Sequence, residues 1–149
     1  MTLNDILFQL CDIDRRVRIL ISDAGFTPDD GLSDSLCPHP DDPEDRFLKK
    51  ILEDLLLPFE DLHEELSYLR APTHGEYRLE LLPNGRYGYF DEHGFCRAFT
   101  CGSPIEARIP DDQGRLLWVS TRMEHDGKNY FLWHYSSVPL DGLTVRERW

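Results

Sequence analysis

Residues 42–70 run DPEDRFLKKILEDLLLPFEDLHEELSYLR, and this stretch decides the fold of the N-terminal half. Its apolar residues alternate spacings of three and four, which is typical of a helix that packs on another helix along a heptad seam. Asp42 suits the N-cap and Pro43 the first helical position. Since the spacing keeps its phase across Pro58, we predict one continuous helix with a kink there. The predicted seam contains Leu48, Leu52, Leu55, Phe59, Leu62, Leu66 and Leu69.

The first 24 residues carry a matching pattern. Thr2 is suited to cap a helix, and Gly25 is placed to end it in the left-handed conformation. We therefore predict a second helix and, over residues 1–70, an antiparallel two-helix hairpin that resembles a coiled coil. Residues 26–41 connect the helices and are longer than closure of a hairpin requires. The seam of the first helix contains Leu3, Ile6, Leu10, Ile13, Val17, Leu20 and Ala24.

From residue 71 onward the apolar period changes from heptad spacing to alternation, which indicates strands. Pro83-Asn84-Gly85 is a hairpin turn signal. Five to six short antiparallel strands within residues 71–149 predict a small SH3-like β barrel, so the fold class is α+β. Six aromatic residues are expected to fill the barrel core, namely Tyr87, Phe90, Trp118, Tyr130, Phe131 and Trp133.

The C-terminal part also resembles a known family. The shared features are Gly102, PIEARI at 104–109, Trp118, RMEH at 122–125, the aromatic pair at 130–131 and GLTVR at 142–146. Across residues 76–149 these features resemble a bacterial family of domains of unknown function carried by conjugative and phage-like elements. The resemblance implies an SH3-like barrel and a mobile genetic element as context, and it brings no catalytic residues. A small acidic protein in that context is similar to inhibitors of defence effectors, such as anti-CRISPR proteins.

Charge is distributed unevenly along the chain, whose formal net charge is −12. Residues 1–70 contain 17 acidic and 7 basic residues, and residues 71–149 contain 11 and 9. Such an acidic half disfavours direct binding of DNA or RNA and favours a partner with a basic surface. We expect a cytoplasmic protein with reduced cysteines and no membrane span, because the sequence lacks a long apolar segment and a secretory leader.

We expect the helical half to bind a protein partner, such as a CRISPR effector or another nucleic-acid-binding protein, whose phosphate-binding groove the carboxylates would occupy. Leu56 and Leu57 fall outside the seam, so they are expected to contact a partner or a second copy in a homodimer. The acidic residues assigned to this surface are Asp29, Asp30, Asp34, Asp41, Asp42, Glu53, Asp54, Glu60, Asp61, Glu64 and Glu65.

Two other functions stay open at this point. Arginines along the strands, with tyrosines between them, are typical of a barrel that binds nucleic acid or serves as an assembly module. A small hydrolase or nuclease could use Glu124 and His125 beside Arg122.

Each chemical motif also has a structural interpretation, which we favour. Residues 124–128 are typical of a hairpin turn. Cys96 and Cys101 near His93 are small side chains of the kind that fill cores. Cys37 and His39 are too few to bind zinc. We therefore expect a non-enzymatic protein without catalytic residues, cofactor or metal.

Overall fold

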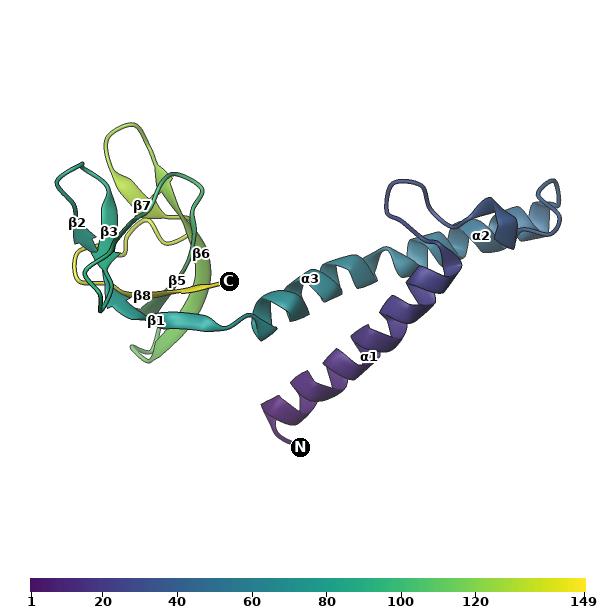
Figure 1. Ribbon diagram of the computed structural model, residues 1–149, viewed down its shortest axis with the longest axis horizontal. Helices are drawn as coiled ribbons and strands as arrows, with labels where there is room; N and C mark the ends of the chain where they lie inside the picture. Colours follow the sequence, from purple (N-terminus) through teal and green to yellow (C-terminus); the bar gives the residue numbers. More distant parts are fainter. The chain divides into compact units, whose positions relative to one another are not determined.

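The computed structural model describes all residues from 1 to 149. The chain divides into two compact units, Met1–Arg70 and Ala71–Trp149, which we call the helical unit and the β unit. The fold is α+β, with helices in the first unit and antiparallel sheets in the second (Figure 1). None of the helices is long and apolar enough to cross a membrane. All four cysteines are free thiols.

Helix α1 (Leu3–Ala24) has both of the predicted caps. The Thr2 side chain accepts a hydrogen bond from the Asp5 amide, and the Asp5 carboxylate accepts one from the Thr2 amide, which forms a capping box. Gly25 ends the helix with φ +62°. These contacts satisfy amide and carbonyl groups that lack a partner within the helix.

The predicted second helix is divided into α2 (Pro43–Leu56) and α3 (Pro58–Arg70). Asp42 caps α2 through the Glu44 amide, with Pro43 in the first turn as predicted. Leu57, between the two helices, keeps a right-handed helical backbone, so Pro58 interrupts the regular helix without a reversal of the chain. In Figure 1, α3 follows α2 in nearly the same direction.

Residues 26–42 form an ordered connection that contains the short 3₁₀ helix η1 (Asp34–Leu36). Thr27 and Gly31 form two backbone hydrogen bonds with each other. The Glu53 carboxylate on α2 accepts a hydrogen bond from the Leu32 amide at 2.9 Å. Phe26 and Leu32 are buried, because the connection folds back over the end of α1.

The interior of the helical unit is small. Its core cluster contains Ile21, Phe26 and Leu32, with Val17, Ala24, Leu56 and Phe59 packed around it. On α3, Leu66 is buried as predicted. The predicted seam also holds for Val17, Ala24 and Phe59, which pack on the core cluster. On α1, the neighbouring positions Asp14 and Ile21 are buried in place of Ile13 and Leu20. The seam prediction is wrong for the positions that are exposed, namely Leu3, Ile6, Ile13, Leu20, Leu48, Leu52, Leu55 and Leu69.

The β unit consists of two antiparallel sheets. The strands are β1 (Thr73–Arg78), β2 (Glu80–Leu81), β3 (Tyr87–Phe90), β4 (Cys96–Ala98), β5 (Pro104–Pro110), β6 (Leu116–His125), β7 (Tyr130–Leu132) and β8 (Thr144–Arg148). Five strands form one sheet in the order β1-β8-β5-β6-β7, and three form the other in the order β2-β3-β4. The predicted Asn84-Gly85 turn joins β2 to β3, with Gly85 at φ +78°. The pairing of β1 with β8 shifts register between His74 and Tyr77.

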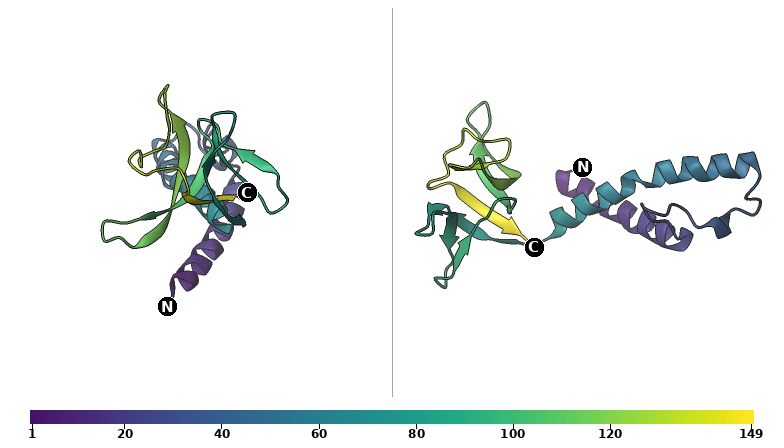
Figure 2. Two further views of the ribbon diagram at one scale, coloured as in Figure 1. Left: turned by 90° about the vertical axis from the view of Figure 1, so that its left-hand side faces the viewer. Right: turned by 90° about the horizontal axis from the view of Figure 1, so that it is seen from above.

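The two sheets share one core (Figure 2). Its buried members are Leu79, Tyr89, Phe99, Ile105, Ala107, Ile109, Met123, Leu132, Leu140 and Val145. The predicted closed barrel is wrong, because neither sheet closes on itself and the strands number eight. The predicted aromatic core is wrong for Phe90 and Trp133, which are exposed, whereas Tyr87 and Tyr130 pack against the core from its edge.

Candidate binding sites of the two units

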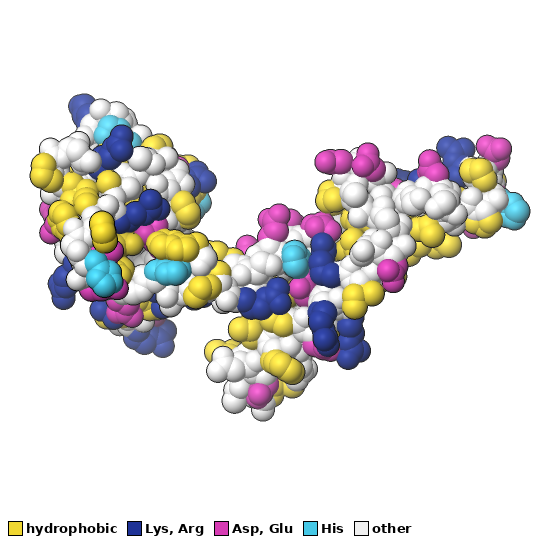
Figure 3. Space-filling model, in the orientation of Figure 1, with side chains coloured by type: hydrophobic (Ala, Val, Ile, Leu, Met, Phe, Trp, Pro, Cys, Tyr) yellow, Lys and Arg dark blue, Asp and Glu magenta, His cyan; other side chains and the backbone are white.

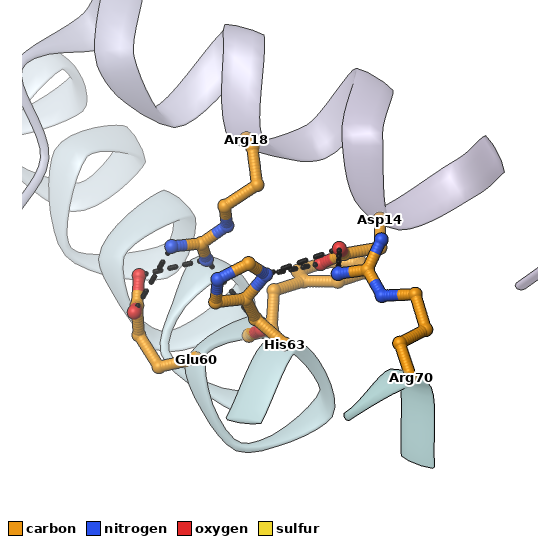
Figure 4. A network of polar contacts seen from close by, with 6 residues as sticks. Asp14, Arg18, Glu60, His63 and Arg70 are labelled. Carbon is orange, nitrogen blue, oxygen red and sulfur yellow. Dashed lines mark hydrogen bonds and ion pairs between the residues drawn. The ribbon is translucent and has the colours of Figure 1, made fainter. Parts of the chain in front are cut away.

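A buried carboxylate joins helices α1 and α3 of the helical unit. The Asp14 side chain on α1 is only 4 % exposed, and both of its oxygens lie 3.0 Å from Nδ1 of His63 on α3 (Figure 4). An Arg70 amino group lies 3.7 Å from the same carboxylate. Because a buried charge must be paired, Asp14 fixes both partners and with them the register of α3 against α1.

A second ion pair lies one turn further along the two helices. Arg18 donates two hydrogen bonds to the Glu60 carboxylate, at 3.1 and 2.8 Å, and one at 3.5 Å to the Phe59 carbonyl (Figure 4). The hydrogen bonds from Arg18 hold the pKa of Glu60 below its usual value. Nε of Arg18 is buried and has no hydrogen-bond partner.

A hollow of about 470 Å³ is lined by Asp14, Arg18, His63 and Arg70 of these contacts, together with Phe8, Cys11, Asp12 and Arg15. The pairing of His63 Nδ1 with Asp14 leaves Nε2 as the nitrogen that could act as a base. The carboxylates and guanidinium groups around the hollow are engaged with one another, as expected of a network that holds two helices together. Nothing in the chain groups three or more metal-ligating side chains.

Sequence reasoning missed this network, although one signal was available. One row along α1 contains Leu7, Asp14 and Ile21 at intervals of seven residues, and Asp14 is the only charged residue in it. Its partner His63 is 49 residues away in the sequence. Only the folded hairpin brings them together.

Five of the predicted partner-binding residues meet at one place. Asp29 and Asp30 from the connection, with Glu53, Asp54 and Leu57 at the end of α2, line a hollow of about 290 Å³. The buried Phe26 side chain is also part of its wall. This corner of the helical unit is therefore acidic with an apolar floor.

The remaining predicted residues lie elsewhere. Asp41 and Asp42 precede α2, and Asp61, Glu64 and Glu65 are exposed on α3. Three others turn inward or pair within the chain: Leu56 packs on the core cluster, Asp34 contacts Lys49 at 2.6 Å, and Glu60 pairs with Arg18.

Almost all basic side chains of the helical unit form ion pairs within that unit. Of the 7 basic residues, only Arg46 has no ion pair. Of the 17 acidic residues, six pair with Lys or Arg, namely Asp12, Asp14, Asp34, Glu53, Asp54 and Glu60. The other 11 of the 17 have no basic partner. Figure 3 shows acidic side chains on the visible face of this unit.

In the β unit, the structure brings together only two of the candidate hydrolase residues, Arg122 and Glu124, whereas His125 makes other contacts. Glu124 accepts hydrogen bonds from Arg122 Nε at 2.5 Å and from Cys101 Sγ at 2.8 Å, whereas His125 packs on Tyr130. The bond to Glu124 raises the pKa of the Cys101 thiol, which disfavours the nucleophilic thiolate. The prediction that Cys96 and Cys101 fill the core is wrong, because both side chains are exposed.

Arginines and tryptophans gather on the outer face of the five-stranded sheet. The Trp118 ring lies 5.7 Å from the guanidinium of Arg108 and 4.1 Å from that of Arg146. Arg122 lies 4.6 Å above the Trp133 ring. Glu106 is buried and pairs with Arg146 and Arg148, which anchors this face. Alternation along the strands places these side chains opposite the shared core.

Comparison with known proteins identifies part of the chain. Residues 79–147 match the family described as "Domain of unknown function (DUF5348)", so this segment is a DUF5348 domain. The matched segment runs from just before β2 into β8. Neither the curated proteins nor the solved structures gave a match to this chain. The family description names neither a function nor a mobile-element origin, so both stay predictions.

Proposed function

We propose that this chain is a non-enzymatic binding protein whose helical unit engages a protein with a basic surface. The observation that carries the proposal is the set of 11 carboxylates without a basic partner in a unit whose bases are almost all paired. Unpaired exposed charges of one sign create a field that steers oppositely charged proteins and can pair with them.

The acidic hollow defines where such a partner would make contact. Asp29, Asp30 and Asp54 surround an apolar floor formed by Phe26 and Leu57. A lysine or arginine side chain suits this combination, because its methylene stem packs on apolar surface while its charged end meets carboxylates. A basic groove of a nucleic-acid-handling protein, such as a defence effector, presents many such side chains and is the class of partner that we propose.

The test is binding of the full chain to bacterial proteins that a phosphate-bearing resin retains, after nuclease treatment. Asp29→Lys with Asp30→Lys reverses two exposed carboxylates of the acidic hollow. Glu80→Lys with Asp112→Lys changes the net charge equally on the β unit and serves as the control. The proposal predicts that only the first variant loses its partner. Equal loss, or no loss, in the two variants contradicts it.

A second function is favoured by the arginine and tryptophan side chains of the sheet. Arg108, Arg122 and Arg146 stack on tryptophans on one face, so we propose the β unit as the part that would contact single-stranded nucleic acid if the chain binds any. Arg108→Gln with Arg122→Gln should abolish retention of single-stranded DNA or RNA at low salt, while Arg86→Gln with Arg115→Gln should not. Absence of retention by the native chain excludes this function.

A further inference from the structure

The helical unit leaves two rows of apolar side chains without a partner. On α1 they are Leu3, Ile6, Ile13 and Leu20, and on α2 they are Leu48, Ile51, Leu52 and Leu55. We call these rows the apolar stripes. The exposed fraction is 48 % for Ile13 in the middle of α1 and 41 % for Leu52 in α2, and it rises to 56 % for Leu20 and 60 % for Leu55 toward the ends of these helices.

The helical unit has a small hydrophobic core. Only four apolar residues are buried, namely Ile21, Phe26, Leu32 and Leu66. Against them stand 15 exposed large apolar residues from position 1 to 69: Met1, Leu3, Ile6, Phe8, Ile13, Ile19, Leu20, Leu36, Phe47, Leu48, Ile51, Leu52, Leu55, Leu57 and Leu69. A unit of 70 residues with so small an interior gains little stability from burial, and contiguous exposed apolar surface marks an interaction site.

The stripes avoid the polar side of the hairpin. At 3.6 residues per turn, Ile13 and Leu20 lie on nearly the opposite side of α1 from Cys11 and Arg18, which face the polar hollow. On α2, Lys49 and Glu53 contact the connection. Leu48, at the edge of the stripe, lines a small hollow together with Leu36 of the connection. All members of the apolar stripes are nevertheless exposed, and no internal ion pair interrupts them.

The spacing of the stripes specifies a helical partner. Leu48, Leu52 and Leu55 keep the alternation of four and three that lets a helix insert side chains between those of another helix. Ile6, Ile13 and Leu20 repeat every seven residues on α1. A partner must therefore offer helices with the same repeat, and this chain supplies two of them.

Charge permits two copies to meet on this side. Residues 3–24 and 43–56, which carry the stripes, each contain four acidic and three basic residues. Residues 25–42 contain five acidic residues and no Lys or Arg, and residues 57–70 contain four acidic residues and one Arg. The excess charge thus lies off the stripe-bearing helices, and like-charge repulsion between copies is weakest there.

We propose that a second copy of this chain covers the apolar stripes, in a two-fold symmetric dimer in which helices of both copies share one core. The inference does not rest on the proposed function, because it uses the apolar side of the helical unit and leaves the acidic hollow open. It goes beyond that function by assigning the chain an obligatory assembly partner.

Sedimentation equilibrium of the full chain over a wide concentration range is the direct test. The native chain is expected at twice its mass of 17.4 kDa and should dissociate on dilution. Ile13→Glu with Leu55→Glu places charges on the stripes and should weaken association about 100-fold. Phe8→Glu is the matched control, since Phe8 is exposed on α1 but lines the polar hollow.

Thermal unfolding gives a second readout that does not need a variant. If folding of the helices is coupled to association, the midpoint of the loss of helical circular dichroism rises with protein concentration. A native chain that is monomeric at all concentrations, with a constant midpoint, overturns the proposal. So does a dimer that the Ile13→Glu, Leu55→Glu double variant leaves intact, or a monomer whose stripes are covered only in a complex with a different protein.

Discussion

The carboxylate of Asp14 and the imidazole of His63 are in contact through both carboxylate oxygens, across the interface between α1 and α3. Removing His63 leaves a buried charge with a single partner, Arg70, at 3.7 Å. His63→Leu should therefore lower the free energy of unfolding of the helical unit by about 2 kcal/mol. Asp14→Leu combined with His63→Leu should restore most of it, because the buried charge is gone.

Chemical denaturation followed by far-UV circular dichroism measures both changes, and the double-mutant cycle isolates the pair. His39→Leu, at an exposed site, controls for loss of a histidine. A double variant as unstable as His63→Leu alone would show that the contact is not what holds the helices.

The Arg18–Glu60 pair should make the helical unit sensitive to acid. The pKa of Glu60 is lowered from 4.5 by its hydrogen bonds with Arg18, so the folded chain keeps the carboxylate charged to lower pH than the unfolded chain does. The resulting stability, about 1 kcal/mol for a partly exposed pair, is complete above pH 4.5 and is lost as the pH falls through the lowered value. Glu60→Gln should be less stable than the native chain at neutral pH and equally stable in acid. Parallel stability curves would contradict this, and Glu65→Gln should match the native curve throughout.

Tyr89 should make the β unit sensitive to alkali. Burial, and then its hydrogen bond to Glu147 at 2.7 Å, raise the pKa of Tyr89 above its usual 10.0. The unfolded chain therefore releases the phenolic proton first, and stability falls as the pH rises above 10. Tyr89→Phe should cost about 1 kcal/mol at neutral pH.

The Tyr89→Phe variant should lose less stability in alkali than the native chain does. Denaturation monitored by tryptophan fluorescence measures this difference, with Tyr135→Phe as the control that keeps the native slope. If Tyr89→Phe lost as much stability at high pH as the native chain, another titrating group would be responsible for the loss.

The Cys101 thiol should react slowly. Because its hydrogen bond to Glu124 raises its pKa, little thiolate is present at neutral pH. Glu124→Gln should speed alkylation of Cys101 by iodoacetamide several-fold, as followed by peptide mass spectrometry. Cys96, which is also exposed, provides the internal reference within the same sample. Slower alkylation in the variant would show that the carboxylate promotes ionisation instead.

The local signals in the sequence predicted the helix ends well, because caps depend on neighbouring residues alone. Thr2, Gly25 and Asp42 are placed as expected. The packing face could not be predicted in the same way. One charged residue, Asp14, is buried at the expense of Ile13 and Leu20, and its partner is remote in sequence.

Strand alternation likewise predicted antiparallel sheets but not their closure. A sheet closes only when its two edge strands pair with each other, and here the edge strands β1 and β7 do not pair. The aromatic residues were misplaced for a related reason: Trp118 and Trp133 are large enough for a core, yet guanidinium groups cover their rings on the outer face. Size alone does not choose between the two faces of a sheet.

The register shift in β1 has a consequence for colloidal behaviour. An exposed edge strand carries unpaired amide and carbonyl groups that can pair with an extended segment of another chain, and such pairing initiates β-sheet aggregation. At the β1 edge, the register shift between His74 and Tyr77 interrupts the row of unpaired backbone groups. At the other edge, β7 (Tyr130–Leu132) is only three residues long, so few such groups are available. The β unit can therefore leave its sheet open without recruiting further strands from its neighbours in solution.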